Sequence, residues 1–435
     1  MARLSRDHFI DLRPLTTSPA FARLWAGSTL SGLGGQLTIV AAMLQMYAIT
    51  HDTFAVSMIA VAGLVPMILA GLYGGMLADA FDRRKVALAA ASITFASTLL
   101  LALLTWFGWE TQWWLYALSV VNSAANSIVM AARTAIVPRL IPVVLLPAAS
   151  ALNGIGFGLM VMAGPALAGI LVATTGYAWT YTVDVVLMTS LFLGLWTLPA
   201  IRPEGAIVRP GLESLKDGWR FLRRASNIRV QYLMDITAMT FGQPLTLFPA
   251  IGAVLLGGGA ITTGVLTAAV AAGTLLSSVF SGPIGRVRHH GLGIQRAVTA
   301  YGAAIAAFGL VLVAAAVGWF APAHVDESSA NIVLICAAAV LLALSGAADN
   351  ISSIYRNTMM QAAVPDAMRG RLQGIFIVVV AGGPRVGALY AGALATFTTL
   401  WFPPLLGGLI VIALVATFAR MHPRFREYDA LHPVP

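Results

Sequence analysis

Long apolar segments separated by short polar breaks constrain this chain more than any other feature, and we count twelve of them. A helix needs about 20 predominantly apolar residues to cross the hydrocarbon core of a bilayer. With 59% hydrophobic residues among 435 and a mean hydropathy of +0.85, the chain has enough for about that number of spans. We place the spans near residues 22–50, 54–79, 86–108, 112–136, 146–174, 177–200, 230–255, 260–285, 293–320, 330–356, 371–396 and 398–420.

The basic residues lie on one side of the predicted membrane. Of the 26 Lys and Arg residues, 25 lie in the two terminal segments, in the central loop, or in the loops after the second, fourth, eighth and tenth spans and the adjoining span ends. Membrane proteins keep such residues on the cytoplasmic side. We therefore predict that both termini are cytoplasmic. The net charge of +9 then reflects membrane topology and does not indicate a nucleic-acid partner.

Residues 201–229 divide the spans into two sets of six. The segment carries apolar residues at helical spacing among Arg and Lys, which favours an amphipathic helix on the inner leaflet. We expect an N-terminal bundle over 1–200, a cytoplasmic linker over 201–229, and a C-terminal bundle with a short cytoplasmic tail over 230–435.

The two halves resemble each other. "NSIVMAARTAIVPRLIP" (126–142) aligns with "DNISSIYRNTMMQAAVP" (349–365), and the alignment pairs Asn126 with Asp349 and Arg133 with Arg356. Internal repeats of this length are typical of transporter folds. The fold class that we predict is an all-α membrane protein of twelve transmembrane helices in two pseudo-symmetric six-helix bundles.

The stretch "GGMLADAFDRRK" (74–85), between the second and third spans, gathers five charges in a chain that is only 10% charged. Asp79 is expected at a helix C-terminus, where the helix dipole disfavours an anion. Arg369, Arg371 and the positive N-terminus of the eleventh span lie on the same side of the membrane. We predict that Asp79 docks there as a cytoplasmic latch that breaks for inward opening. Alternatively, the charges only set the topology.

The same stretch resembles the G-x-L-A-D-R-x-G-R-R/K signature of the major facilitator superfamily. Ala80 stands where that signature has a basic residue, and Asp82 where it has glycine. The segment 356–384 is similar to the region between helices 10 and 11 of enterobactin-exporter-like members of the drug:proton antiporter branch. The residues that match the signature are Gly75, Leu77, Ala78, Asp79, Arg83 and Arg84.

Gly164 and Pro165 match the Gly-Pro motif that exporters of this superfamily carry in the fifth helix. Gly383 and Pro384 are the aligned pair in the second half. The resemblance implies an alternating-access transporter that exports a siderophore or an amphiphilic drug in exchange for protons. We expect no cofactor, a small-molecule substrate and protons as partners, a location in the lipid bilayer of the cell membrane, and function as a monomer. Uptake by proton symport stays open, and a polytopic membrane enzyme or sensor is the alternative outside transport.

Six charged residues fall within predicted spans, and each costs at least ~2.5–3.5 kcal/mol near the bilayer centre unless it faces water or a partner. Proton coupling needs a carboxylate that binds and releases a proton as its surroundings change. Asp349 is the first candidate because the other half has Asn126 at the symmetric position, and Asp235 and Asp184 follow. The six residues are Asp184, Asp235, Asp349, Arg133, Arg356 and Arg385.

The intramembrane arginines have alternative roles. Arg133 and Arg356, near cytoplasmic ends, either line the substrate cavity with Asn126 or extend to the interface. Arg356 can also pair with Asp349, two turns away on one helix face. Arg385 lies ~21 Å of helix rise from Arg371, too deep to reach the interface easily. It is either a structural partner of an acid such as Asp349 or a cation for an anionic or catechol-bearing substrate.

Several enzyme classes and metal sites are excluded. Neither lysine, Lys85 or Lys216, follows a glycine, so there is no Walker A loop and no ATP hydrolysis of that kind. The single cysteine, Cys336, allows no internal disulfide and is expected to be an apolar packing residue. His289 and His290 have no Cys or acidic companions at metal-ligand spacing. We expect a transporter without enzymatic activity.

The predicted cytoplasmic latch can be tested by a substitution at Asp79. We expect Asp79→Asn to change both the transport rate and the balance between inward-facing and outward-facing states, because the amide carries no charge for the facing helix N-terminus. Transport assays combined with accessibility labelling measure both quantities. A variant that behaves like the parent in both would leave the charges of 74–85 with a topological role only.

Overall fold

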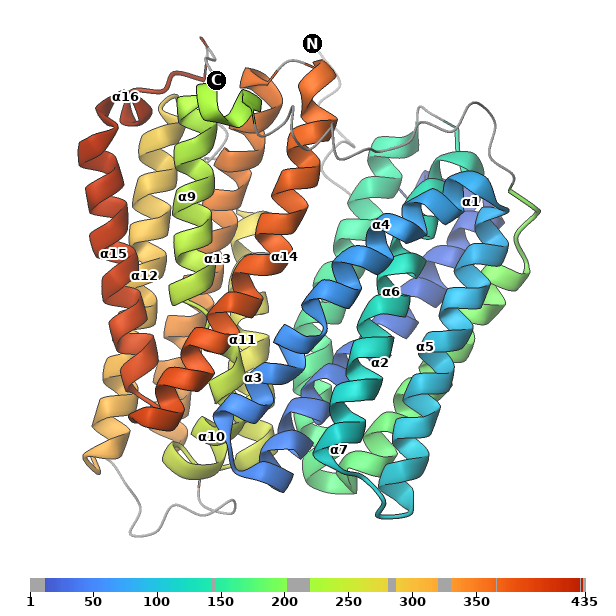
Figure 1. The fold of residues 1–435 in the computed structure, drawn as a ribbon, viewed down its shortest axis with the longest axis horizontal. Helices are drawn as coiled ribbons and strands as arrows, with labels where there is room; N and C mark the ends of the chain where they lie inside the picture. Colours follow the sequence, from blue (N-terminus) through green and yellow to red (C-terminus); the bar gives the residue numbers. More distant parts are fainter. Residues whose placement is uncertain are drawn as a thin grey trace, which may run out of the picture. The chain divides into compact units, whose positions relative to one another are not determined.

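The computed structural model describes residues 12–142, 145–201, 220–280, 287–319, 330–364, 366–430 and 432 (Figure 1). Side chains are described throughout these ranges except at 72, 75, 78, 79, 147, 150, 151, 361 and 366–381. The described residues form helices and no β-strand. The elements are α1 (Arg13–Thr17), α2 (Pro19–Thr50), α3 (Thr53–Ala62), α4 (Leu64–Ala80), α5 (Arg83–Trp106), α6 (Gln112–Leu140), α7 (Leu146–Trp196), α9 (Ser226–Phe241), η2 (Leu245–Leu247), α10 (Phe248–Ala250), η3 (Ile251–Leu255), α11 (Gly259–Val279), α12 (His290–Ala316), α13 (Ile332–Ala363), α14 (Asp366–Phe397), α15 (Phe402–Met421) and α16 (Pro423–Arg426).

Within the described ranges, ten segments are long and apolar enough to cross a membrane, which confirms the all-α membrane fold class. One of the ten, Leu152–Trp196, contains a reversal at Gly176, whose φ of 84° suits a residue without Cβ. The predicted fifth and sixth spans meet at this glycine. Helix α14 corresponds to the predicted eleventh span and is not among the ten. The observed helices are compatible with twelve spans.

The chain divides into two compact units. Residues 1–45 and 65–209 form the first unit, and residues 46–64 and 210–435 form the second. Residues 46–64 group with the second unit because α3 packs along α14. The boundaries predicted for the bundles and linker stay a prediction. Residues 202–219, most of the predicted amphipathic helix, lie outside the described residues, whereas 220–224 are helical.

The core of the first unit lies where α5, α6 and α7 meet. Small residues of α5, Ala87, Ala90 and Ala91, are buried against Ala132 and Ile136 of α6. Small side chains let helix backbones approach closely, which is how helices associate in a medium as apolar as their own surfaces.

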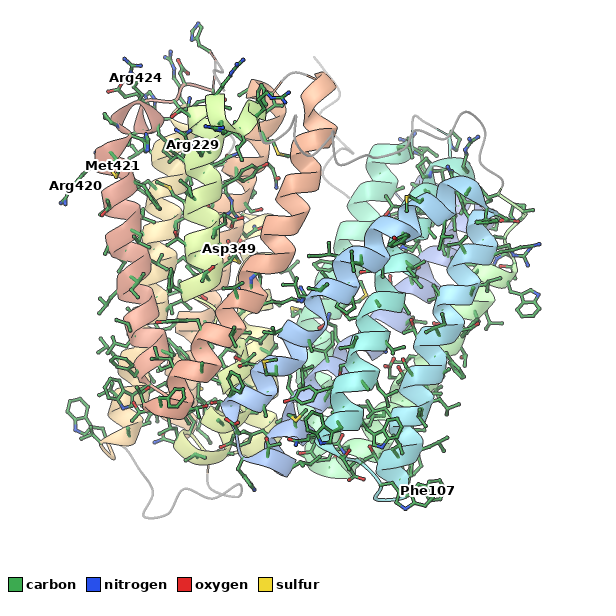
Figure 2. All side chains as sticks on the ribbon, in the orientation of Figure 1. Phe107, Arg229, Asp349, Arg420, Met421 and Arg424 are labelled. Atoms are coloured by element: carbon green, nitrogen blue, oxygen red, sulfur yellow. The ribbon has the colours of Figure 1, made fainter. Side chains whose placement is uncertain are left out.

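The second unit has the larger core, shared by α9 and α11 to α16. Ile228 and Met234 of α9 are fully buried, and Phe248 of α10 packs edge-to-face on Phe308 of α12 with ring centroids 6.2 Å apart. In Figure 2, Arg229, Arg420 and Arg424 lie toward one end of this unit, and Asp349 lies between its two ends. The basic residues labelled there share an end, as the positive-inside pattern predicts.

Two spans are interrupted. The second predicted span is divided into α3 and α4 at Gly63, three residues before Pro66. The seventh leaves regular α-helix at Gly242, before Pro244, and continues through η2, α10 and η3. Proline lacks the N–H that would continue the helical hydrogen-bond ladder. At the second break the Tyr301 hydroxyl of α12 donates a hydrogen bond to the Gly242 carbonyl at 2.6 Å.

The C-terminal segment folds back on the start of α12. Phe425 of α16 is only 1% exposed and belongs to the core of the second unit. Arg288 donates two hydrogen bonds to the Asp429 carboxylate, at 2.9 and 2.6 Å, and these raise the pKa of Arg288 above its ordinary value. The Ala430 amide donates to the Arg288 carbonyl at 3.0 Å. The tail is therefore part of the folded unit.

We expect Phe425→Ala to lower the free energy of unfolding by about 3–5 kcal/mol, because truncating a fully buried aromatic ring leaves a cavity. Thermal unfolding of the purified protein in detergent measures the change. Arg424→Ala, on the exposed side of the same short helix, is the matched control and should leave the midpoint nearly unchanged. Equal midpoints for the two variants would contradict a docked tail.

Candidate functional site

Three of the predicted intramembrane charges meet in the second unit. Arg356 of α13 forms an ion pair through Nη1 with Asp235 of α9, and its Nη2 lies 3.5 Å from Oδ1 of Asp349, also on α13. The pairing of Asp349 with Arg356 predicted from their spacing is confirmed. We call Asp235, Asp349 and Arg356 the charge cluster.

Burial distinguishes the two acids of the charge cluster. The Asp235 side chain is 2% exposed, the Arg356 side chain 8%, and the Asp349 side chain 36%. Asp235 is therefore buried, and Arg356 is buried beside it and does not extend to the interface, which was one of the roles left open for it. Each has the other as its partner, which offsets the cost of a charge in a low-dielectric interior.

Several polar atoms around this ion pair are buried without a hydrogen-bond partner among the described residues. They are Oε1 of Gln231, Oδ2 of Asp235, Oγ of Ser352 and Nε of Arg356. Gln231 lies one turn before Asp235 on α9, and Ser352 lies one turn before Arg356 on α13. A buried donor or acceptor left unpaired costs about 1–3 kcal/mol. The site is thus polar enough to bind water or to accept a proton.

Tyr301 of α12 is a neighbour that the sequence pattern did not predict. It is 5% exposed and lies within electrostatic range of Asp349. Because its hydroxyl also donates to Gly242, it connects the surroundings of Asp349 with the interruption of the seventh span. No local motif marks Tyr301, since its partners come from α9 and α13.

The third candidate acid, Asp184, lies in the first unit and has different surroundings. It is 1% exposed on α7, and Oγ1 of Thr38 on α2 donates a hydrogen bond to its Oδ2 at 2.5 Å. Its Oδ1 has no hydrogen-bond partner among the described residues. Asp184 has no cation in an ion pair within the described part of the chain, unlike Asp235.

The symmetric positions of the first unit lack the charge cluster. Arg133 is half-buried on α6 and Asn126 is exposed, and neither has a hydrogen bond or ion pair with any residue that the structure describes. The repeat therefore preserves the arginine position but not the acid that pairs with it. The predicted role of both residues in the substrate cavity stays a prediction.

The predicted cytoplasmic latch is described only in part. Gly75 and Asp79 belong to α4, and Arg369 and Arg371 to α14, but their side chains lie outside the described residues. Arg83 donates to the Ala135 carbonyl at 2.9 Å.

Arg84, next along α5, donates to the Trp196 carbonyl at 2.6 Å. Asp82 caps α5 through the Arg84 amide at 3.0 Å and also accepts from the Ile201 amide at 3.2 Å. These contacts fasten the start of α5 to α6 and to the end of α7.

The two Gly-Pro pairs lie at close helix contacts. Gly164 and Pro165 are buried on α7, where Gly164 faces Gln36 of α2. Gly383 is buried on α14 against Met239 of α9, and a Cβ there would lie 2.9 Å from Cβ of Met239; Pro384, which follows it, is partly buried. Glycine at such points allows the helix backbones to approach.

Arg385 of α14 is not paired with Asp349 in any contact that the structure gives. Its Nε donates to the carbonyl of Ala60 on α3 at 3.1 Å. Cys336, expected to pack, is exposed on α13. Among the described residues, no group of three His, Cys, Asp or Glu is placed to hold a metal ion.

Comparison with known proteins identifies the family. A family model described as transmembrane secretion effector matches residues 11–435. The chain belongs to this family. It is accordingly a multi-pass membrane transporter of the major facilitator superfamily, of the exporting kind. Its family implies a small-molecule substrate.

Curated relatives include the protein named enterobactin exporter EntS in three bacteria. This transporter is 28% identical to EntS of Citrobacter koseri over 393 residues, which cover 90% of this chain and 88% of that protein. The same identity and coverage hold for the proteins of Shigella boydii and Escherichia coli.

Solved structures support the fold. A POT family transporter in complex with a thioalcohol-conjugated peptide has a TM-score of 0.71 at 11% identity, with 94% of this chain and 96% of that chain covered. The nucleoside transporter NupG, as its D323A mutant, has a TM-score of 0.70 at 16% identity, with 92% and 99% covered. At these identities the likeness concerns the fold alone.

We expect Arg356→Leu to lower the free energy of unfolding by about 3–5 kcal/mol, because it leaves the Asp235 carboxylate buried without a partner. Thermal unfolding in detergent measures this. The double variant Arg356→Leu with Asp235→Leu should recover much of the loss.

Arg133→Leu, at the symmetric position, is the control and should cost little, since Arg133 pairs with no described residue. If Arg133→Leu and Arg356→Leu shifted the midpoint equally, the ion pair would have no special importance for stability.

Proposed function

We propose that this transporter is a secondary active exporter driven by exchange with protons, and that the charge cluster couples the two movements. The observation that carries the proposal is a buried arginine shared by two carboxylates of unequal exposure on α9 and α13. Export itself accords with the transmembrane secretion effector family. Proton coupling is the step that we add.

The charge cluster has the composition that a proton carrier needs. Two carboxylates and one guanidinium carry a net charge of −1 when ionised, so one bound proton makes the cluster neutral. A neutral cluster is less costly in a low-dielectric interior than a charged one. Proton binding can therefore change which conformation the second unit prefers.

Asp349 is the member of the charge cluster that we assign to proton exchange. Its side chain is 36% exposed and lies at 3.5 Å from Arg356, whereas Asp235 is almost fully buried in its ion pair. The more exposed and more weakly paired acid exchanges protons more readily. Asp235 keeps Arg356 in position, and Arg356 stabilises Asp349 when Asp349 is ionised.

The cargo that we propose is a siderophore or an amphiphilic drug. Support comes from relatives named enterobactin exporter, which align over 90% of this chain. A siderophore would leave the cell through this transporter against its gradient while protons enter. Uptake by symport predicts the opposite direction of cargo movement under the same proton gradient.

Topology and mechanism complete the proposal. Both termini lie in the cytoplasm. The linker 201–229 is also cytoplasmic and joins the bundles over 1–200 and 230–435. The transporter works as a monomer by alternating access. The cytoplasmic latch of Asp79 with Arg369 and Arg371 closes one side, and the cargo meets Asn126 and Arg133 in the central cavity.

We expect Asp349→Asn to abolish the acceleration of export by a proton gradient while leaving downhill exchange of cargo, because an amide cannot bind and release the coupling proton. Proteoliposomes with an imposed pH gradient and a catecholate siderophore provide the assay. A fluorescent amphiphilic drug in a parallel set tests the second cargo class.

Asp184→Asn is the matched control, since it changes a second buried intramembrane acid in the other unit. If Asp349→Asn keeps full gradient-driven export and Asp184→Asn loses it, the coupling site lies in the first unit. Cargo accumulation in the direction of proton flow would replace antiport by symport.

A further inference from the structure

The C-terminal segment covers a histidine at the start of α12. His290 is only 5% exposed. Its ring centroid lies 5.2 Å from that of Tyr355 on α13 and 6.3 Å from that of Tyr428, which follows α16. The rings of His290 and Tyr428 are stacked, with 29° between their planes. The imidazole is therefore enclosed between a spanning helix and the terminal segment.

We call residues 423–430 the tail strap, because they lie tightly against the start of α12. A Cβ at Gly291 would collide with the Phe425 carbonyl oxygen, so only glycine allows this approach. Asp429 forms an ion pair with Arg288 and an antiparallel bridge with His289. These contacts hold Tyr428 over the imidazole.

The enclosure suits a neutral imidazole better than a protonated one. The His290 ring has a hydrogen bond with the backbone of Val287, whereas its Nδ1 is buried and has no hydrogen-bond partner among the described residues. A neutral imidazole carries hydrogen on one nitrogen, and an imidazolium carries it on both. Protonation would therefore leave a second N–H, together with a positive charge, buried without an acceptor.

The groups around His290 do not compensate for this charge. The Asp429 carboxylate is already bound by Arg288 at 2.6 Å and by His432 at 3.2 Å, and no described residue forms an ion pair with His290. Tyr355 and Tyr428 contact the imidazole through their rings, whose attraction for a cation is smaller than the cost of burying it unpaired. The other described charged and titratable groups of the strap and of the nearby ends of the helices that pack here are His289, Arg296, Arg229, Tyr232, Asp235, Arg356, Arg420, His422, Arg424, Arg426 and Glu427.

The same contact reaches the charge cluster. Tyr355 is 6% exposed and packs on Gly293 of α12, where a Cβ would lie 2.7 Å from its Cε2 atom. Arg356, the next residue of α13, pairs with Asp235 and Asp349. A change in the packing of Tyr355 therefore acts one residue away from the arginine of the charge cluster.

We infer that His290, Tyr355 and the tail strap form a pH-sensitive switch, in which the strap is docked while His290 is neutral and is released when His290 binds a proton. Release loosens α13 beside Arg356 and slows export. Protons that enter the cell in exchange for cargo then limit their own further entry. This last step rests on the cytoplasmic tail and the proton exchange of the proposed function.

The direction of the pH effect follows from linkage. The docked form binds one proton fewer than the released form, so a lower pH favours release. A free imidazole takes up its proton at about pH 6.5, so the equilibrium constant for release should rise about tenfold between about pH 7.5 and about pH 5.5.

Hydrogen–deuterium exchange of the purified protein in detergent, without cargo, measures release. The Ala430 amide is the reporter, because it donates to the Arg288 carbonyl at 3.0 Å when the strap is docked. After correction for the intrinsic exchange rate, its protection should be about tenfold lower at the acidic pH.

Substitutions at His290 test the switch directly. His290→Phe keeps a ring between the two tyrosines and cannot bind a proton, so the strap should stay protected at both pH values. His290→Lys carries a charge at both pH values and should lower protection at both. Thermal unfolding checks that each variant is folded, and His290→Gln replaces His290→Phe if the latter is not.

Two neighbouring histidines provide matched controls. His289→Gln changes an exposed side chain next to His290, and His432→Gln removes the imidazole that lies 3.2 Å from Asp429. Protonated His432 would strengthen its pair with Asp429, which opposes release. Both controls should keep the tenfold response. An equal response in His290→Phe, or its loss in His432→Gln, would overturn the inference.

Export assays test the consequence for transport. In proteoliposomes with a constant pH difference and a catecholate siderophore as the probe, acidifying the cytoplasmic side should slow export by the parent protein but not by His290→Phe. Equal slowing of the two proteins would overturn the control of export by the strap. If neither protein moves the siderophore at either pH, the proposed cargo is wrong, and the exchange measurement still decides the switch.

Discussion

The absence of hydrogen-bonding partners in lipid is the constraint on which the rest of this structure depends. Uninterrupted helices satisfy it internally, so the functionally informative points are the places where a span is interrupted or ends. At three of them a side chain from another helix donates a hydrogen bond to a backbone carbonyl. Tyr301 donates to the Gly242 carbonyl at the break after α9, Arg385 to Ala60 at the end of α3, and Arg84 to Trp196 at the end of α7.

The same constraint explains how charge is arranged within the spans. A single charge in the bilayer is costly, but an arginine between two acids is tolerated and leaves a cluster that one proton makes neutral. The two halves differ at this point. The first has an arginine without a described acidic partner, Arg133, and the second has Arg356 between Asp235 and Asp349. Two similar halves, of which only the second has the charge cluster, fit our proposal that the second half carries the coupling proton.

Local patterns predicted much of this protein, and the errors have a common cause. The span positions follow from hydropathy, and the pairing of Asp349 with Arg356 from spacing on one helix, because both depend on neighbours in the chain. Cys336 was expected to pack, and the structure has it exposed on α13. Tyr301 and Thr38 were missed. In each case the outcome depends on which distant helix lies alongside, and a single sequence contains no signal for that.

What the sequence by itself determined is the class of the protein and the approximate course of its spans. These follow from the free energy of transferring residues into lipid, which is a property of each segment alone. The tertiary structure alone decided that Asp235 joins Arg356, that α3 lies on α14, and that Arg385 donates to a helix carbonyl. Those contacts join residues more than 100 positions apart, and only packing of the helices brings their side chains within hydrogen-bonding distance.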